Sequence, residues 1–204
     1  MEQNRLRIIK NVIFQYEAST QYVRGTEDCL VVSVYTPKLP SKSDPDLLPV
    51  FAWIHGPDFQ KGSGNADMQG PNRIMDYNVI MVTLNYRLGP LGFLTLEDDI
   101  LPGNFGLWDQ KLALEWIQLN IGAFGGDPEK VTLAGSGSGA TCALLHYISP
   151  QSKSLFQSVL SISPGSLVPV LSQNHPSVYT RKLVGKLGCD SKYSQDILDC
   201  LRQG

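Results

Sequence analysis

The sequence predicts an α/β protein built on a doubly wound, mostly parallel β-sheet. Short apolar runs with little alternation recur along the chain, and strands that are buried on both faces of a parallel sheet have this pattern. Longer segments with helical periodicity separate several of these runs. Strands and helices in succession are typical of right-handed crossovers within a single sheet.

The strands and helices can be assigned from these patterns. The predicted strands are 30–35, 48–55, 79–86, 131–134 and 159–162. The predicted helices are about 106–121, from just after Gly139 to Tyr147, and about 177–187. Apolar residues of the first helix cover more than one face, so we expect it to be well buried. The polar segment 38–47 is predicted to be a surface loop and not a domain linker.

Composition excludes several classes of protein. The chain has 204 residues, 42% hydrophobic and 18% charged, which favours one packed domain over a disordered chain. A net charge of −2 gives no strong field for nucleic acid or an anionic membrane. No apolar run reaches the ~20 residues of a membrane span. Four cysteines form no C-x-x-C pair, so a structural zinc site is not predicted, and we expect neither another metal nor a cofactor.

The first residues do not resemble a signal peptide. A secretory signal needs an unbroken apolar segment, whereas Arg5, Arg7 and Lys10 interrupt the apolar residues here. We therefore expect a short surface strand or an irregular start.

The informative motif lies at the junction of a strand and a helix, in residues 131–140. Its glycine-rich turn has the setting of a nucleophile elbow, G-x-S-x-G, with Gly135 and Gly139 as the outer glycines. Gly137 stands where the serine is expected. Glycine has no side-chain oxygen, and loss of a triad serine costs on the order of 10⁶ in rate. The sequence therefore predicts that the nucleophile position is vacated.

Two serines flank Gly137 and leave an alternative open. Ser136 and Ser138 are each one residue away from the central position. A sharp elbow directs only its central side chain into the cleft. Ser138 is the first candidate for a displaced nucleophile.

A second motif suggests a damaged oxyanion hole. An H-G-G-G-type loop commonly supplies its donors, and the sequence here is His55-Gly56-Pro57-Asp58. Pro57 has no N–H to donate, and the carboxylate of Asp58 has the wrong sign beside a developing oxyanion. The backbone N–H of Ser138 remains as one donor. Loss of one donor costs ~3 kcal/mol of transition-state stabilisation.

The histidines do not suggest a triad base. His55 belongs to the oxyanion loop, His146 to the helix after the elbow and His175 to a polar loop. We expect all three to be structural or solvent-exposed.

Four further motifs resemble type-B carboxylesterases and cholinesterases. They occur in order between Thr26 and Arg202, and they are residues 26–30, 85–89, 103–110 and 124–128. The resemblance implies that residues 1–204 are the N-terminal half of an α/β-hydrolase core, with residues 1–25 poorly matched. It also implies that the family's catalytic acid and histidine fall beyond Gly204.

Within that family, a G-x-G-x-G elbow resembles the cholinesterase-like adhesion proteins, namely neuroligins and the neurotactin and glutactin types. The resemblance implies a non-catalytic domain, extracellular or at the cell surface, that binds a partner protein. The Pro57-Asp58 loop and the chain length depart from the neuroligin pattern. Two alternatives stay open: a carboxylic ester hydrolase with an altered nucleophile, and a truncated chain without a function of its own.

The same resemblance implies several structural roles. It pairs Arg87 with Asp109 in a buried ion pair and joins Cys189 to Cys200 in a short-loop disulfide, which would indicate an oxidising compartment. Cys29 matches a cysteine whose family partner lies upstream, where this chain has none, so a free thiol is expected. Cys142 is expected to be a small buried apolar residue.

Overall fold

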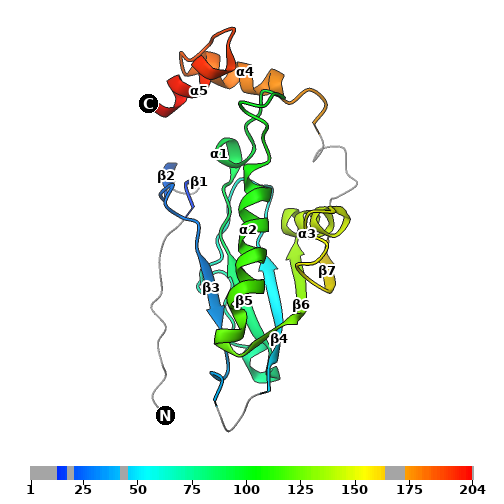
Figure 1. Ribbon diagram of the computed structural model, residues 1–204. Helices are drawn as coiled ribbons and strands as arrows, with labels where there is room; N and C mark the ends of the chain where they lie inside the picture. Colours follow the sequence, from blue (N-terminus) through cyan, green and yellow to red (C-terminus); the bar gives the residue numbers. More distant parts are fainter. Residues whose placement is uncertain (1–12, 18–20, 42–45, 164–172, 204) are drawn as a thin grey trace.

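The computed structural model describes residues 13–17, 21–41, 46–163 and 173–203 (Figure 1). Most of residues 1–25 and part of the predicted loop 38–47 lie outside these ranges. In chain order the elements are β1 (Gln15–Glu17), β2 (Tyr22–Arg24), β3 (Val32–Tyr35), β4 (Leu48–Ile54), η1 (Ile74–Tyr77), β5 (Ile80–Leu84), α1 (Gly89–Phe93), α2 (Phe105–Asn120), η2 (Ile121–Phe124), β6 (Gly126–Ser136), α3 (Ser138–Ile148), β7 (Ser158–Ile162), α4 (Ser177–Lys186) and α5 (Ser194–Gln203).

The main sheet confirms the predicted fold class. Its strand order is β3-β5-β4-β6-β7, in which β4 to β7 are parallel and β3 runs antiparallel to β5. Each predicted strand corresponds to one of these five, and β6 begins earlier than predicted because residues 126–130 extend it. The parallel strands bring the ends of β4, β5 and β6 to one edge of the sheet. The connections that follow them therefore meet there.

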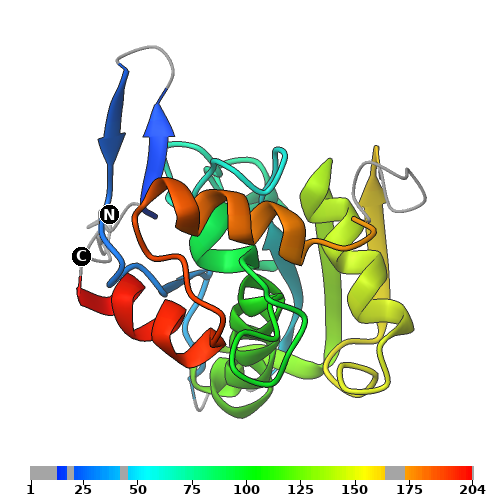
Figure 2. The ribbon, with the colours of Figure 1, turned by 90° about the horizontal axis from the view of Figure 1, so that it is seen from above.

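Both long helices of the core cover the same face of the sheet. Val50, Ala52 and Ile54 of β4 point toward them and are buried, whereas Phe51 and Trp53 alternate to the opposite face. Gln110 of α2 donates a hydrogen bond to the Cys142 sulfur of α3, which places the two helices side by side. Figure 2 shows this layer from above.

The expected burial of α2 on more than one face is wrong. Ala113, Leu114 and Ile117 face the sheet and are buried. Trp108 and Leu119 are 50% and 84% exposed. These two side chains point away from the sheet, to a side of the helix that no described residue covers.

The continuous apolar runs also predicted more burial of the sheet than the structure shows. Every residue of the interior strand β5 is buried, as expected for a strand covered on both faces. On the edge strand β7, Leu160 and Ile162 are about half exposed, at 47% and 46%. They point to the face opposite α3, where the described residues provide no cover.

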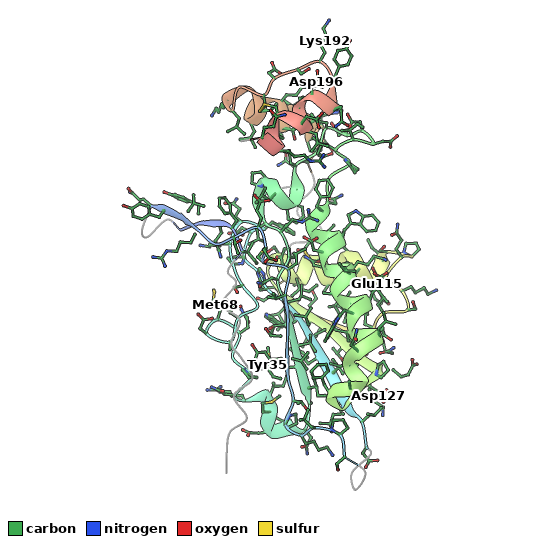
Figure 3. All side chains as sticks on the ribbon, turned by 60° about the vertical axis from the view of Figure 1, so that its left-hand side comes forward. Tyr35, Met68, Glu115, Asp127, Lys192 and Asp196 are labelled. Carbon is green, nitrogen blue, oxygen red and sulfur yellow. A yellow bond between two sulfur atoms is a disulfide. The ribbon has the colours of Figure 1, made fainter. Side chains whose placement is uncertain are left out.

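A small second core holds the C-terminal helices. Leu96 and Leu101 pack against Val184 of α4 and Ile197 of α5, and a disulfide joins Cys189, just after α4, to Cys200 within α5. Figure 3 shows Lys192 and Asp196 at one end of the molecule, far from Asp127 at the other. Helix α5 was not predicted, and neither was the β1–β2 hairpin.

The same loop that supplies Leu96 and Leu101 supplies polar contacts to both helices. Ser177, the first residue of α4, donates its backbone N–H and its hydroxyl to the Glu97 carboxylate. Ser194, the first residue of α5, donates its hydroxyl to Asp98. Two adjacent acidic side chains therefore lie at two helix N-termini, where the helix dipole favours negative charge.

Candidate functional site

The elbow has the backbone geometry that its sequence motif predicts. β6 ends at Ser136, α3 begins at Ser138, and Gly137 alone makes the turn with φ 57° and ψ −121°. A side chain in this conformation is strained, but glycine adopts it readily. The N–H of Gly137 donates to the Ile162 carbonyl of β7 at 3.1 Å, which fixes the turn to the sheet.

The three glycines of the elbow have different surroundings. A Cβ placed on Gly139 would lie 2.1 Å from the Ile54 carbonyl oxygen, and one on Gly135 would lie 2.4 Å from the Gly139 backbone. Neither position can hold a side chain without moving the backbone. A Cβ on Gly137 would meet no atom within 4 Å. The central position therefore has open space for a side chain, and the sequence places none there.

The flanking serines are not displaced into that open space. Ser138 is 5% exposed, and its hydroxyl accepts a hydrogen bond from the Phe59 backbone N–H at 3.4 Å. Ser136 is partly buried at the end of β6. Ser138 is thus held beneath the oxyanion loop, not presented at the centre of the turn.

The oxyanion loop lies directly on the elbow. A Cβ on Gly56 would lie 2.5 Å from the Ser136 carbonyl oxygen and 3.5 Å from the Ser138 backbone nitrogen. Pro57 and Asp58 are exposed. Asp58 and Phe59 have φ values of 59° and 58°, in the left-handed region that favours glycine. The loop thus approaches the Ser138 N–H through Gly56, while Pro57 has no N–H to offer.

His55 begins this loop and is fully buried. Its ring stacks on Tyr86 with the ring centroids 4.6 Å apart, and its carbonyl accepts a hydrogen bond from the Tyr86 hydroxyl at 2.8 Å. Neither ring nitrogen has a hydrogen-bond partner within the described part of the chain. Burial lowers the pKa of His55 from 6.5 to about 4, so the imidazole is neutral at pH 7.

The other two histidines occupy different environments. His146 lies behind the elbow, where Nδ1 contacts the Ser152 hydroxyl at 2.9 Å and Nε2 contacts the Gln110 side-chain oxygen at 3.1 Å. Burial, with a smaller effect of nearby Lys111, lowers its pKa to about 4. His175 is exposed in the turn before α4. Neither of them contacts Ser138 or Gly137.

Arg87 and Asp109 form a two-pronged ion pair. Arg87 Nε and Nη2 donate to the two Asp109 oxygens at 2.8 and 2.7 Å, and the Arg87 backbone N–H adds a bond of 3.0 Å. The Asp109 side chain is 5% exposed and that of Arg87 is 37% exposed. The hydrogen bonds to Asp109 raise the pKa of Arg87 above its ordinary value. The pair joins the segment after β5 to the N-terminal part of α2.

The cysteines fall into two groups. Cys189 and Cys200 form a disulfide, whereas Cys29 and Cys142 are free and buried. Burial raises the pKa of the Cys142 thiol to about 12, so this thiol is unreactive. Within the described ranges, no three His, Cys, Asp or Glu side chains gather in a metal-binding arrangement. None of the described helices is both long and apolar enough to cross a membrane.

A mostly parallel sheet whose strand turns sharply into a helix at an elbow, with a loop from a neighbouring strand over the turn, defines an α/β-hydrolase fold. The sequence model of the carboxylesterase family matches residues 6–204. The chain therefore belongs to the carboxylesterase family.

Its relatives include both esterases and adhesion proteins. Juvenile hormone esterase of Tribolium castaneum is 45% identical over 96% of this chain and 33% of its own length. Neuroligin-2 of Mus musculus is 41% identical over 92% of this chain and 24% of its own length. A solved juvenile hormone esterase from Manduca sexta, with OTFP covalently attached, matches 94% of this chain and 37% of its own with TM-score 0.82 and 31% identity. The chain spans between 24% and 37% of the length of these relatives.

The structure adds contacts that the sequence did not suggest. Phe59 links the oxyanion loop to Ser138, and Tyr86 holds His55 by stacking and by a hydrogen bond. Asn85 accepts the Gly64 N–H and donates to the Cys29 carbonyl. Residues 85–89 were recognisable as a motif, but a motif alone does not show which backbone groups its side chains bind.

Proposed function

We propose that this chain is a non-catalytic carboxylesterase-family domain that binds a partner protein. The observation that carries the proposal is Gly137, at the centre of an otherwise well-formed elbow. Its backbone angles and the open space above it fit a nucleophile position, yet it has no side-chain oxygen to attack an ester. Nucleophilic catalysis requires such a group next to a base.

The oxyanion loop supports the same proposal independently. Pro57 cannot donate a hydrogen bond, and Asp58 adds negative charge to the loop that should stabilise an oxyanion. His55, which begins this loop, is buried against Tyr86. At the elbow and the oxyanion loop, the described residues therefore supply a backbone donor from Ser138 and no serine hydrogen-bonded to a histidine, since the contact of His146 with Ser152 lies behind the elbow.

A fluorophosphonate probe tests the absence of a nucleophile, because it labels activated serines covalently. We expect no labelling of the purified chain and no hydrolysis of p-nitrophenyl butyrate, with an esterase of the same family as positive control. Stoichiometric labelling or enzyme-like turnover would contradict the proposal. An exposed surface lysine or tyrosine reacts slowly and without saturation, so saturable kinetics identify a true site.

An esterase with a displaced nucleophile is the second candidate, since Ser138 lies beside the loop and next to Gly137. Ser138→Ala tests it, with Ser136→Ala as the matched control. Labelling that is lost in Ser138→Ala and kept in Ser136→Ala would support this candidate. The Ser138 hydroxyl already binds the Phe59 N–H within a buried contact, which favours the non-catalytic proposal.

The partner and its location extend the proposal. Neuroligin-2 is among the relatives, and the Cys189–Cys200 disulfide favours an oxidising compartment, so we infer an extracellular or cell-surface role. A fluorescent tetramer of the chain should bind intact cells in a saturable manner that trypsin treatment of the cells abolishes. Binding that survives trypsin would point away from a protein partner.

A further inference from the structure

A surface pocket lies at the base of the β1–β2 hairpin and has no residue in common with the elbow or the oxyanion loop. Its volume is about 260 Å³. Figure 1 shows the hairpin beside α1, and the pocket is formed where the two meet. Its lining residues are Ile13, Phe14, Thr26, Glu27, Cys29, Leu30, Arg87, Leu88 and Leu91.

The pocket has a buried floor and an exposed apolar rim. Ile13, Cys29 and Leu88 are at most 2% exposed. Phe14, Leu30 and Leu91 are between 39% and 46% exposed. Small-molecule sites are commonly concave and mostly apolar, with volumes of about 300–1,000 Å³, and this pocket is slightly smaller than that range.

Hydrogen bonds and an ion pair hold the walls in place. The Cys29 carbonyl accepts a hydrogen bond from the Asn85 side chain at 3.0 Å, and Ile13 forms a β-bridge with Thr26. Arg87 is fixed by two side-chain bonds to Asp109. A wall that is already ordered loses little conformational entropy when a ligand enters.

The charges of the lining favour an uncharged ligand. The Arg87 charge is already compensated by Asp109 at 2.7 Å, and Glu27 is an exposed residue at the mouth. An anion would be repelled by the Glu27 carboxylate, and a cation on the apolar floor would lose hydration, because Glu27 is exposed at the mouth and not on the floor. An engineered apolar cavity of about 150 Å³ holds benzene, so the larger volume here has room for a substituted ring.

We propose that this pocket binds a small neutral molecule with one aromatic or branched aliphatic ring, whose apolar body contacts Ile13, Cys29 and Leu88. This site goes beyond the proposed function, because partner binding at the surface does not require a small ligand. It also does not depend on the chemistry of the elbow.

Three probes of similar size test the chemical class of the ligand: neutral 4-methylphenol, anionic benzoate and cationic benzylammonium. Saturation-transfer NMR and calorimetry on the full chain should show binding of 4-methylphenol about tenfold or more tighter than that of either ion. Equal or tighter binding of either ion would overturn the proposal. Failure of 4-methylphenol to bind at millimolar concentration would do so as well.

Substitutions at the rim test the location. Leu91→Arg and Leu30→Arg place a charged chain at the mouth and should weaken 4-methylphenol binding by about tenfold or more. Leu112→Arg and Leu119→Arg make the same change at exposed positions of α2 and should leave binding within about twofold. Because all four side chains are at least 39% exposed, circular dichroism should show an unchanged fold. Equal effects from both pairs would place the binding site elsewhere.

Discussion

The elbow and the oxyanion loop are in contact, but they differ in whether glycine occupies the positions with a positive φ. The elbow has glycine at its central position, Gly137, where φ is 57°, so the turn is formed without side-chain strain. The loop has Asp58 and Phe59 at φ values of 59° and 58°, which cost free energy in residues that have a Cβ. The elbow therefore lacks a side chain that a catalytic site needs. The oxyanion loop, in contrast, has side chains at two positions whose backbone conformation favours glycine.

This difference shows that the backbone geometry of the elbow does not depend on a catalytic side chain. The elbow geometry is enforced by Gly139 and Gly135, whose missing side chains allow close backbone approach. These contacts persist although Gly137 has no hydroxyl. The turn from β6 into α3 is thus required to pack the sheet, and it remains whether or not the site can catalyse a reaction.

The largest predicted effect concerns one buried histidine in each region, His55 in the loop and His146 behind the elbow. Both imidazoles have a pKa of about 4 in the folded chain instead of 6.5. The unfolded chain takes up these protons near pH 6.5, whereas the folded chain stays neutral until about pH 4. Stability is therefore fully present above pH 6.5 and decreases as the pH falls toward 4, by ~3 kcal/mol per histidine at the lower limit.

Guanidinium unfolding between about pH 7 and about pH 4.5 measures this loss. His55→Gln and His146→Gln should each lower by about one the number of protons that the chain takes up on unfolding in this pH range. His175→Gln, at an exposed position, should leave the slope unchanged. A pH profile that stays flat in the unsubstituted chain would refute the prediction for both regions.

Gly139→Ala tests how strictly the elbow requires glycine. The new Cβ would lie 2.1 Å from the Ile54 carbonyl oxygen, so β4 or α3 must move, at a cost of about 3 kcal/mol. Gly137→Ala is the matched control, because its Cβ meets no atom within 4 Å and it costs only the backbone strain of φ 57° and ψ −121°, about 1.5 kcal/mol. Thermal unfolding should separate the two variants clearly. Similar losses would mean that backbone strain, not close packing, dominates the elbow.

Gly56→Ala tests the contact between the two regions. Its Cβ would lie 2.5 Å from the Ser136 carbonyl oxygen. The exposed loop can shift more easily than a helix, so we expect a loss of about 2 kcal/mol. Gly122→Ala, where a Cβ meets nothing within 4 Å, serves as the control in chemical denaturation. A loss no larger than that of the control would show that the loop is free to move off the elbow.

The smallest effect is expected at Asp58. Asp58→Ala should cost about 1 kcal/mol, because alanine tolerates the left-handed conformation less well than aspartate. Asp58→Gly should stay within about 0.5 kcal/mol, since relief of strain is offset by greater freedom of the unfolded chain. Thermal unfolding in low salt measures both. If alanine and glycine behave alike, the left-handed backbone does not limit the loop.

The sequence predicted the fold where local and tertiary preferences agree. Five β-branched or apolar runs became the five strands of the main sheet, and the elbow followed from glycines at a fixed spacing. The burial of α2 was overestimated because an apolar pattern does not say which neighbours cover it, and Trp108 and Leu119 remain exposed. Helix α5 could have been predicted, because Ile197, Leu198 and Leu201 have helical spacing; it is ten residues long and packs on a small separate core beside the disulfide.

The residue types of the candidate site could be predicted from the sequence, but the contacts between them could not. Gly137, Pro57 and Asp58 could be interpreted from their chemistry alone, since each lacks or adds a group that catalysis requires. The burial of Ser138 under Phe59 and the packing of His55 on Tyr86 depend on residues far apart in the chain. Side-chain partners of this kind follow from the closed fold and not from local sequence.

The acidic pair Glu97 and Asp98 has a consequence for the order of folding. They bind the first residues of α4 and α5 from 80 and 96 positions earlier in the chain. Neither helix can gain these contacts until the loop after α1 is in place, and such distant contacts form late because their loop-closure entropy is high. The C-terminal helices should therefore acquire protection from hydrogen exchange after the sheet does. The disulfide would then hold together two helices that the loop after α1 has already positioned.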